Sequence, residues 1–154
     1  VMKGAAFIAV AGIVTALAVT HIEKIKGLGR RMPITSLGLV ISLLALAGVP
    51  PLNGFWSKLV LFGSAIDAGT TVWWGPWLAV AGVLNSALSL AYYGWIIRKM
   101  YFEGEREKRI KEPRSIIAVM IFSIIFMVTI GVYPDPIIQF SEFAAPAINV
   151  AFTP

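Results

Sequence analysis

Lys58 is the residue whose type and position most clearly indicate chemistry. It follows the segment 50–54, which reads Pro-Pro-Leu-Asn-Gly, and the apolar residues 59–62 follow it in turn. The two prolines remove backbone donors and the glycine frees the chain, so a helix is expected to break at 50–54. An ionised lysine at the centre of a membrane-spanning helix costs roughly 2.5 to 3.5 kcal/mol on insertion scales. Some feature of the site must therefore offset that cost.

Two interpretations of Lys58 are compatible with this placement. In the plainer one, the long stem lies along the helix and carries the ammonium to the headgroup region. Against it, non-helical backbone at membrane depth is tolerated only beside protein or a water-filled cavity, and an intramembrane ionisable residue is a functional site by default. Burial favours the neutral amine over the ammonium, so such a group can exchange a proton near neutral pH. We therefore predict that Lys58 belongs to a proton relay.

Lys3 is the second relay candidate, because it opens the apolar run 3–10. It would be an ordinary interfacial anchor if Val1 were a natural terminus. A chain that starts without Met, within two residues of an apolar helix, indicates a piece of something longer. A non-Met start codon or a split gene would look the same.

Three other side chains could extend the relay, and each also has a plain explanation. His21 is the single histidine, lies close to a loop and cannot build a metal site alone. Tyr92 and Tyr93 could exchange hydrogen bonds inside a helix bundle, or merely hold helices together. We therefore keep all three as possible relay members.

Soluble-type catalysis is not indicated. The sequence has no nucleophile, base and acid set and no phosphate-binding loop, so we predict no catalytic, cofactor-binding or metal-ligating residues. It also has no cysteine, which excludes disulfides, thiolate metal sites and iron–sulfur ligation by this chain. Redox cofactors, if the system uses them, would therefore belong to partner subunits.

The composition is that of a membrane protein. Over 154 residues the hydrophobic fraction is 58%, the charged fraction is 14% and the mean hydropathy is +0.81, whereas soluble domains carry about 25% charged residues. Apolar stretches of about 20 residues, the length needed to cross a bilayer, recur along the chain. We predict an all-α, polytopic transmembrane helix bundle that forms a single module over residues 1–154. The net charge of +5 does not indicate nucleic-acid binding, because the basic residues flank apolar helices.

Charge decides how many crossings the bundle has. The strongly basic connections 23–33 and 98–114 should both be cytoplasmic, which requires an even number of crossings between them. Residues 36–66 then form one crossing, interrupted partway, and we expect about four crossings in all, with five as the alternative. The predicted spans are residues 4–22, 36–66, 76 or 77 to 99, and 115–133.

The segments outside these spans are expected to be polar or interfacial. The surroundings of Asp67 and the tail with Asp135 and Glu142 should lie on the side opposite the basic connections. The charged stretch 103–113 mixes both signs, so we interpret it as a solvated loop. Residues 137–152 are interrupted by a proline and are expected to lie along the membrane interface.

Three motifs in order carry a resemblance to a known family. They occupy residues 27–35 (Gly-Leu-Gly-Arg-Arg-Met-Pro-Ile-Thr), 44–58 (Leu-Ala-Leu-Ala-Gly-Val-Pro-Pro-Leu-Asn-Gly-Phe-Trp-Ser-Lys) and 85–102. Together they resemble the antiporter-like membrane subunits shared by respiratory complex I, membrane-bound hydrogenases and multisubunit sodium/proton antiporters. Each motif alone is moderately specific, whereas their order and spacing extend the match over most of the chain.

The resemblance implies a protein of about fourteen helices with two inverted repeats, each with a broken helix, of which this chain is similar to the C-terminal four. The first half-channel would be absent. By position, Lys58 resembles the lysine of the second broken helix, and Lys3 resembles the lysine that opens the preceding helix. Some members continue the motif with acidic residues where this chain has Leu59 and Val60, which favours an N-type or hydrogenase-type subunit over the distal L-type.

The function implied is proton or sodium translocation, without redox chemistry of its own, in a larger oxidoreductase complex. Iron–sulfur or other redox centres are expected on partner subunits, and the partners are other polytopic membrane subunits, peripheral redox subunits and lipid. The location implied is the cytoplasmic membrane. The alternatives are a non-conducting structural membrane module and a subunit of a multisubunit sodium/proton antiporter. An independent secondary transporter is disfavoured, because this chain has one broken helix where inverted repeats would supply two.

Overall fold

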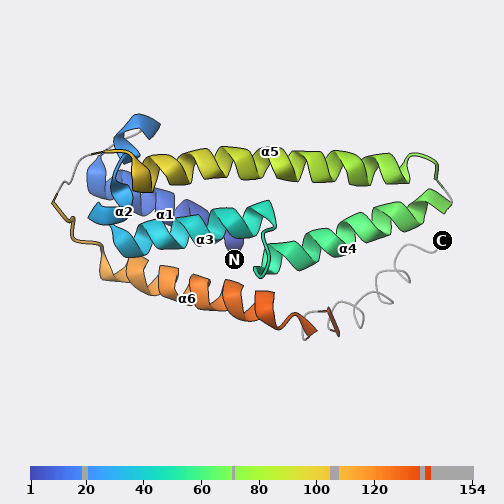
Figure 1. Ribbon diagram of the computed structural model, residues 1–154. Helices are drawn as coiled ribbons and strands as arrows, with labels where there is room; N and C mark the ends of the chain where they lie inside the picture. The colour runs from blue at the N-terminus through green and yellow to red at the C-terminus, as the bar shows by residue number, and fades with distance from the viewer. Residues whose placement is uncertain (19–20, 71, 105–107, 136–137, 140–154) are drawn as a thin grey trace, which may run out of the picture.

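The computed structural model describes residues 1–18, 21–70, 72–104, 108–135 and 138–139 (Figure 1). All the regular structure in this part of the chain is helical, which confirms the predicted all-α class. The α-helices are α1 (Met2–Leu17), α2 (Leu28–Arg31), α3 (Pro33–Ala47), α4 (Asn53–Asp67), α5 (Gly75–Phe102) and α6 (Arg114–Val132). Two 3-10 turns, η1 (Ile22–Ile25) and η2 (Ala68–Thr70), lie in the connections.

Helices α3 and α4 form one interrupted crossing. They follow one another in the same direction, and α5 runs back alongside both of them (Figure 1). Each half has 15 residues and α5 has 28, so each half is about 22 Å long and α5 is about 42 Å long. The interrupted crossing predicted for residues 36–66 is confirmed, and the described helices agree with four crossings rather than five.

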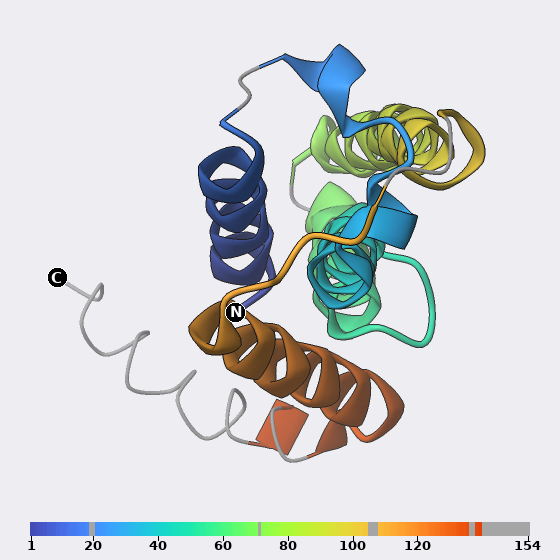
Figure 2. The same ribbon diagram turned by 90° about the vertical axis from the view of Figure 1, so that its left-hand side faces the viewer.

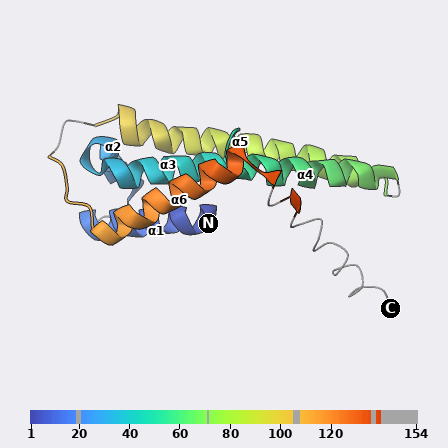
Figure 3. The same ribbon diagram turned by 90° about the horizontal axis from the view of Figure 1, so that it is seen from below.

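Helix α3 is the centre of the bundle. Figure 2 shows it surrounded by α1, α5 and α6, and Figure 3 shows α6 passing across it toward the break. Small residues of α1, including Ala5 and Ala9, are buried against it, as are Met120 and Met127 of α6. Small side chains let helices approach closely in a membrane, where packing rather than exclusion of water drives association.

The first helix is shorter than expected. The predicted span 4–22 contains no charged acidic or basic residue other than His21, but α1 ends at Leu17, and Ala18 has a left-handed φ of 50°. Glycine and proline are absent from residues 13–22, so the sequence contains no local signal for this end. Most of the tail predicted to lie along the interface, residues 137–152, falls outside the described residues.

The two basic connections meet at one end of the bundle, as their charge predicted. The amide of Gly27 donates to the carbonyl of Lys99 at 3.4 Å, and the ammonium of Lys26 lies 3.7 Å from a carboxylate oxygen of Glu103. Asp67 lies at the opposite end, where α4 turns into α5 (Figure 1). The two ends thus differ in charge, while the assignment of the basic end to the cytoplasm stays a prediction.

The surface of the helices is apolar. Helices α5 and α6 are long and apolar enough to span a membrane, and α1 and α3 are shorter apolar helices. Beyond the break, and within the part of the chain that the structure describes, α4 and α5 pack mainly against each other (Figure 1). Their exposed large side chains include Leu59, Leu61, Trp73, Trp77 and Leu84. Such a surface suits lipid or other membrane helices rather than water.

Candidate functional site

The break between α3 and α4 is built by local turn chemistry. Gly48 ends α3 with φ 87°, a left-handed conformation that glycine adopts at little cost. Its amide donates to the carbonyls of Leu44 and Ala45, each at 3.1 Å. The Pro50-Pro51 bond that follows is cis, and α4 begins at Asn53, two residues after Pro51. The predicted break at 50–54 is therefore confirmed.

Two glycines let the chain pack tightly around the break. A Cβ on Gly54 would overlap the carbonyl oxygen of Ala45, and a Cβ on Gly131 of α6 would overlap that of Pro51. The indole Nε1 of Trp56 also donates to the Gly131 carbonyl at 2.8 Å. The start of α4 is thereby fixed against both α3 and α6.

Lys58 turns its ammonium back to the end of α3. Its Nζ donates to the carbonyl of Ala47 at 2.7 Å and to Oγ of Ser86 in α5 at 2.9 Å. Ser86 in turn donates to the carbonyl of Gly82 at 2.9 Å. The C-terminus of a helix carries a partial negative charge, which favours a cation there. This contact offsets the cost of placing a charged lysine at membrane depth.

Gly48 is needed for this contact as well as for the turn. A Cβ at its position would lie 2.8 Å from Cδ of Lys58 and 3.4 Å from Nζ. The lysine stem therefore passes over a position where only a glycine leaves enough room. The plainer interpretation of Lys58, in which the ammonium reaches out to the headgroups, does not describe this structure.

A cavity of about 400 Å³ adjoins the break. Its lining residues include Met2, Asn53, Trp56, Ser57 and Ile130. The side-chain oxygen of Asn53 is buried and has no hydrogen-bond partner among the described residues. A space of this size beside an open acceptor is large enough for several water molecules.

Lys3 lies at the level of the break. The N-terminus of α1 is close to the end of α3 (Figure 1), and Sδ of Met2 lies 3.2 Å from the place that a Cβ on Gly54 would occupy. The Lys3 side chain is exposed, and within the described part of the chain no hydrogen bond or ion pair joins it to Lys58. The relay role of Lys3 stays a prediction.

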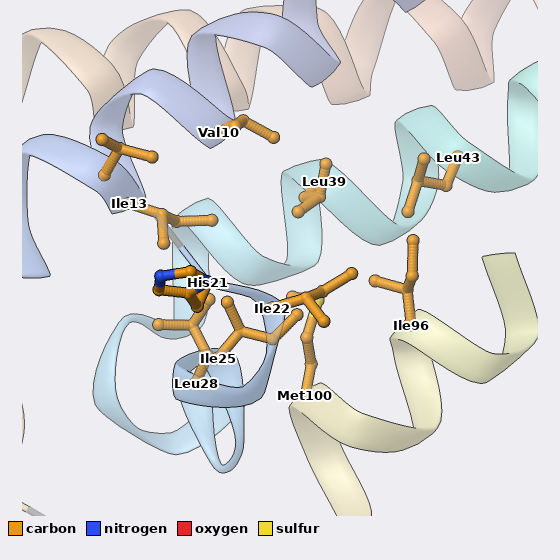
Figure 4. Close-up of a pocket in the computed structure, with 11 residues that line it drawn as sticks. Val10, Ile13, His21, Ile22, Ile25, Leu28, Leu39, Leu43, Ile96 and Met100 are labelled. Atoms are coloured by element: carbon orange, nitrogen blue, oxygen red, sulfur yellow. The ribbon is translucent and has the colours of Figure 1, made fainter. Parts of the chain in front are cut away.

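The other relay candidates lie away from Lys58. His21 lines an apolar cavity of about 270 Å³ near the basic end, together with Ile13, Leu39 and Met100 (Figure 4). Tyr92 is exposed, with its ring centroid 5.9 Å from that of Trp95 and 6.1 Å from that of Tyr93. Tyr93 packs against the core. No described hydrogen bond connects His21 or the tyrosines to Lys58.

Two features of the site could not be found from the sequence. The Ala47 carbonyl is a backbone group, so no residue type announces it. Ser86 was recognisable only as one of several polar residues in α5, and its spacing does not single it out. In addition, Glu112 is half-buried and bonded to α3, so the interpretation of residues 103–113 as a solvated loop is wrong for this residue.

Comparison with known proteins identifies the family. Residues 1–89 match the protein family described as NADH:quinone oxidoreductase/Mrp antiporter, transmembrane. The chain belongs to this family. Its antiporter-family character is thus shown over more than half its length, including the break and Lys58.

Curated relatives give the same result over a longer stretch. The chain is 38% identical to F420H2 dehydrogenase subunit N of Methanosarcina mazei, over 94% of this chain and 30% of that protein. It is 36% identical to NADH-quinone oxidoreductase subunit N of Granulibacter bethesdensis, over 82% of this chain and 26% of that protein. These relatives are N subunits, one of the two types that the residues after Lys58 favour. This chain spans about 30% of the length of the relatives it matches.

A solved structure agrees with the fold. One chain of respiratory complex I from Thermus thermophilus, in a structure with bound aureothin, matches with a TM-score of 0.63 and 26% sequence identity. The match covers 83% of this chain and 30% of that one. Over most of its length, this chain therefore has a fold similar to that of part of one complex I chain.

Proposed function

We propose that this antiporter-family chain carries the second ion-transfer site of an N-type subunit in a redox-driven membrane complex. The observation that carries the proposal is the placement of the Lys58 ammonium on the open carbonyl end of α3, beside Ser86. The family and the N-subunit relatives support it. The chain performs no redox chemistry itself.

The transfer step is an exchange of one proton at Nζ of Lys58. In the charged state the ammonium donates to Ala47 and Ser86, and the end of α3 stabilises its charge. Loss of the proton to one side leaves an amine that still has two N–H donors for these partners. A proton from the other side restores the ammonium, so one proton crosses and the protein returns to its starting state.

Sodium transport would use the same site differently. A sodium ion and an ammonium repel one another at short range, so Lys58 would not be a sodium ligand in its charged state. Sodium would instead move in exchange for the proton of Lys58. This possibility keeps a multisubunit sodium/proton antiporter as a second candidate, supported by the family description, which includes Mrp antiporters.

The proposed partners are other polytopic membrane subunits, together with peripheral subunits that hold iron–sulfur or other redox centres. The apolar surface of α4 and α5 beyond the break supports contacts with further membrane helices and lipid. The proposed location is the cytoplasmic membrane, with the basic connections on the cytoplasmic side.

The test is ion uptake by vesicles that contain the whole complex. Lys58→Ala should abolish uptake driven through this subunit while electron transfer continues. Lys58→Arg should fail too, because a guanidinium does not release its proton at working pH. Lys108→Ala, which removes an exposed lysine from the basic end, is the control and should pump normally.

Assembly of each variant is checked in parallel. An assembled Lys58→Ala complex that moves ions at the unmodified ratio would refute the relay role. The chain would then be better described as a non-conducting structural module.

A further inference from the structure

The N-terminal end of α3 is closed by a carboxylate from the far end of the α5–α6 connection. Glu112 accepts hydrogen bonds from the amide of Thr35 at 2.7 Å, from its hydroxyl at 2.5 Å and from the amide of Ile34 at 3.3 Å. Glu112 and Thr35 are 77 positions apart in the sequence. The contact is therefore tertiary. It joins the start of α3 to the connection that follows α5.

Glu112 satisfies the donors that α3 leaves open. The first amides of a helix lack partners within it. Pro33 stands first and has no N–H, and the amide of Ser36 already donates to the carbonyl of Met32 at 3.0 Å. Only Ile34 and Thr35 are left, and both donate to Glu112. The residue in the local cap position, Met32, makes no side-chain cap hydrogen bond, so the carboxylate replaces a local cap.

A second contact holds the same connection in place. The amide of Ile110 donates to the carbonyl of Arg31 at 3.0 Å, immediately before α3 begins. Ile110 is also packed against the hydrophobic core, and Thr35 is fully buried. Residues 110–112 therefore fix the start of α3 at two points.

The two ends of α3 carry opposite charges. The Glu112 carboxylate lies at its N-terminus, where the helix dipole favours an anion, and the Lys58 ammonium lies at its C-terminus, where the dipole favours a cation. The 15-residue helix separates them by about 22 Å. Direct attraction over that distance is weak, especially at a solvated end. The helix itself, as a rigid rod, is the stronger link.

We propose that Glu112 is a positioning residue for ion transfer at Lys58. By anchoring the first turn of α3, it fixes that helix along its axis and so sets the Ala47 carbonyl at the distance at which Lys58 can bond Ala47 and Ser86 together. This inference rests on the proposed ion-transfer function. It assigns to the α5–α6 connection a role in the geometry of the break at the other end of α3.

The experiment compares three variants in the intact complex. Glu112→Ala removes both acceptor oxygens, whereas Glu112→Gln keeps one of them without the charge. Glu103→Gln is the matched control, because it removes a carboxylate from the same end of the bundle, one that pairs with Lys26 and Arg98 instead of α3. The measurements are amide hydrogen exchange of residues 33–47, electron transfer, and ions taken up per electron-transfer turnover.

The expected result separates positioning from simple loss of structure. Loss of a helix cap should raise exchange at the start of α3 about tenfold in Glu112→Ala, with a smaller rise in Glu112→Gln. Ions per turnover should fall in Glu112→Ala and recover partly in Glu112→Gln, with electron transfer kept. A merely structural role would reduce the amount of complex without changing that ratio. If the Glu112→Ala complex does not assemble, Glu112→Gln alone tests the positioning role, by amide exchange at the start of α3 and by ions per turnover.

Unchanged ions per turnover in the assembled Glu112 variants would overturn the inference, and so would an equal loss in Glu103→Gln. The Lys58→Ala measurement does not depend on whether Glu112 is a positioning residue. Normal pumping by Lys58→Ala would refute the proposed function, whereas failure of Lys58→Ala together with normal pumping by the Glu112 variants would refute only the positioning role.

Discussion

Trp56 and Gly131 connect the helix after the break to the end of α6. The indole N–H donates to the Gly131 carbonyl at 2.8 Å, and the glycine leaves no room for a side chain against Pro51. The two residues belong to helices that are far apart in sequence, so the contact is tertiary, and Gly131 packs directly against the turn at Pro51 and Leu52. The break is therefore a packed structure and not merely a gap between helices.

Substitutions at the contact between Trp56 and Gly131 should lower the stability of the subunit in the complex more than they lower ion transfer. Trp56→Phe loses one hydrogen bond, worth about 1 kcal/mol, and should lower the temperature at which the complex releases this subunit while leaving ions per turnover unchanged. Gly131→Ala should be worse, because the added methyl overlaps the backbone of Pro51 and Leu52. Equal stability of the two variants would contradict this ranking.

Ser86 should contribute to ion transfer through its hydrogen bond with Lys58. Ser86→Ala removes one of the two described partners of the ammonium, and a hydrogen bond to a charged group contributes about 1.5 to 3 kcal/mol. We expect the rate of ion uptake through this subunit to fall roughly tenfold or more. Ser89→Ala is the matched control. The Ser89 hydroxyl donates to the carbonyl of Asn85, four residues earlier, just as that of Ser86 donates to Gly82, but Ser89 has no hydrogen bond with Lys58. Equal effects of the two variants would argue against the Lys58–Ser86 contact in transfer.

Replacing Gly48 should disturb both the turn that ends α3 and the position of Lys58. Gly48→Ala forces a residue with a Cβ into a left-handed conformation, which costs about 1–2 kcal/mol, and brings that Cβ against the stem of Lys58. We expect reduced assembly and, in the complexes that do assemble, reduced ion uptake. Gly63→Ala in α4 is the control, because nothing lies within 4 Å of the added Cβ and it should raise helix stability slightly.

The orientation of the bundle can be tested by labelling. Cysteines replacing Ala68 and Lys108, both exposed and at opposite ends of the helices, should react with impermeant reagents from opposite sides of the membrane. The Lys108 position should be the cytoplasmic one. Labelling of both from one side would rule out an odd number of crossings between them.

The break and Lys58 could be predicted from the sequence because their signals are local. Prolines and glycine interrupt a helix wherever they occur, and a lysine among apolar residues is conspicuous in any membrane segment. The end of α1 at Leu17 could not be predicted, because hydropathy continues past it without glycine or proline.

The partners of these residues depend on tertiary structure. The carbonyl of Ala47 and the hydroxyl of Ser86 reach Lys58 only when α3, α4 and α5 are side by side. Glu112 stands in a stretch of mixed charges, and its sequence neighbourhood is that of an ordinary solvated loop. Its role is visible only because the first turn of α3 has two open amides beside it.

The break between α3 and α4 also changes the electrostatic profile of the membrane. In an unbroken crossing both helix ends lie in the headgroup regions, where water already solvates charge. Here the negative end of one helix lies partway along the crossing and is bonded to Lys58. In the proposed transfer, a proton crossing about 30 Å of hydrocarbon would bind to the neutral amine of Lys58 at this stabilised site partway across, so that one high barrier is divided into two lower ones.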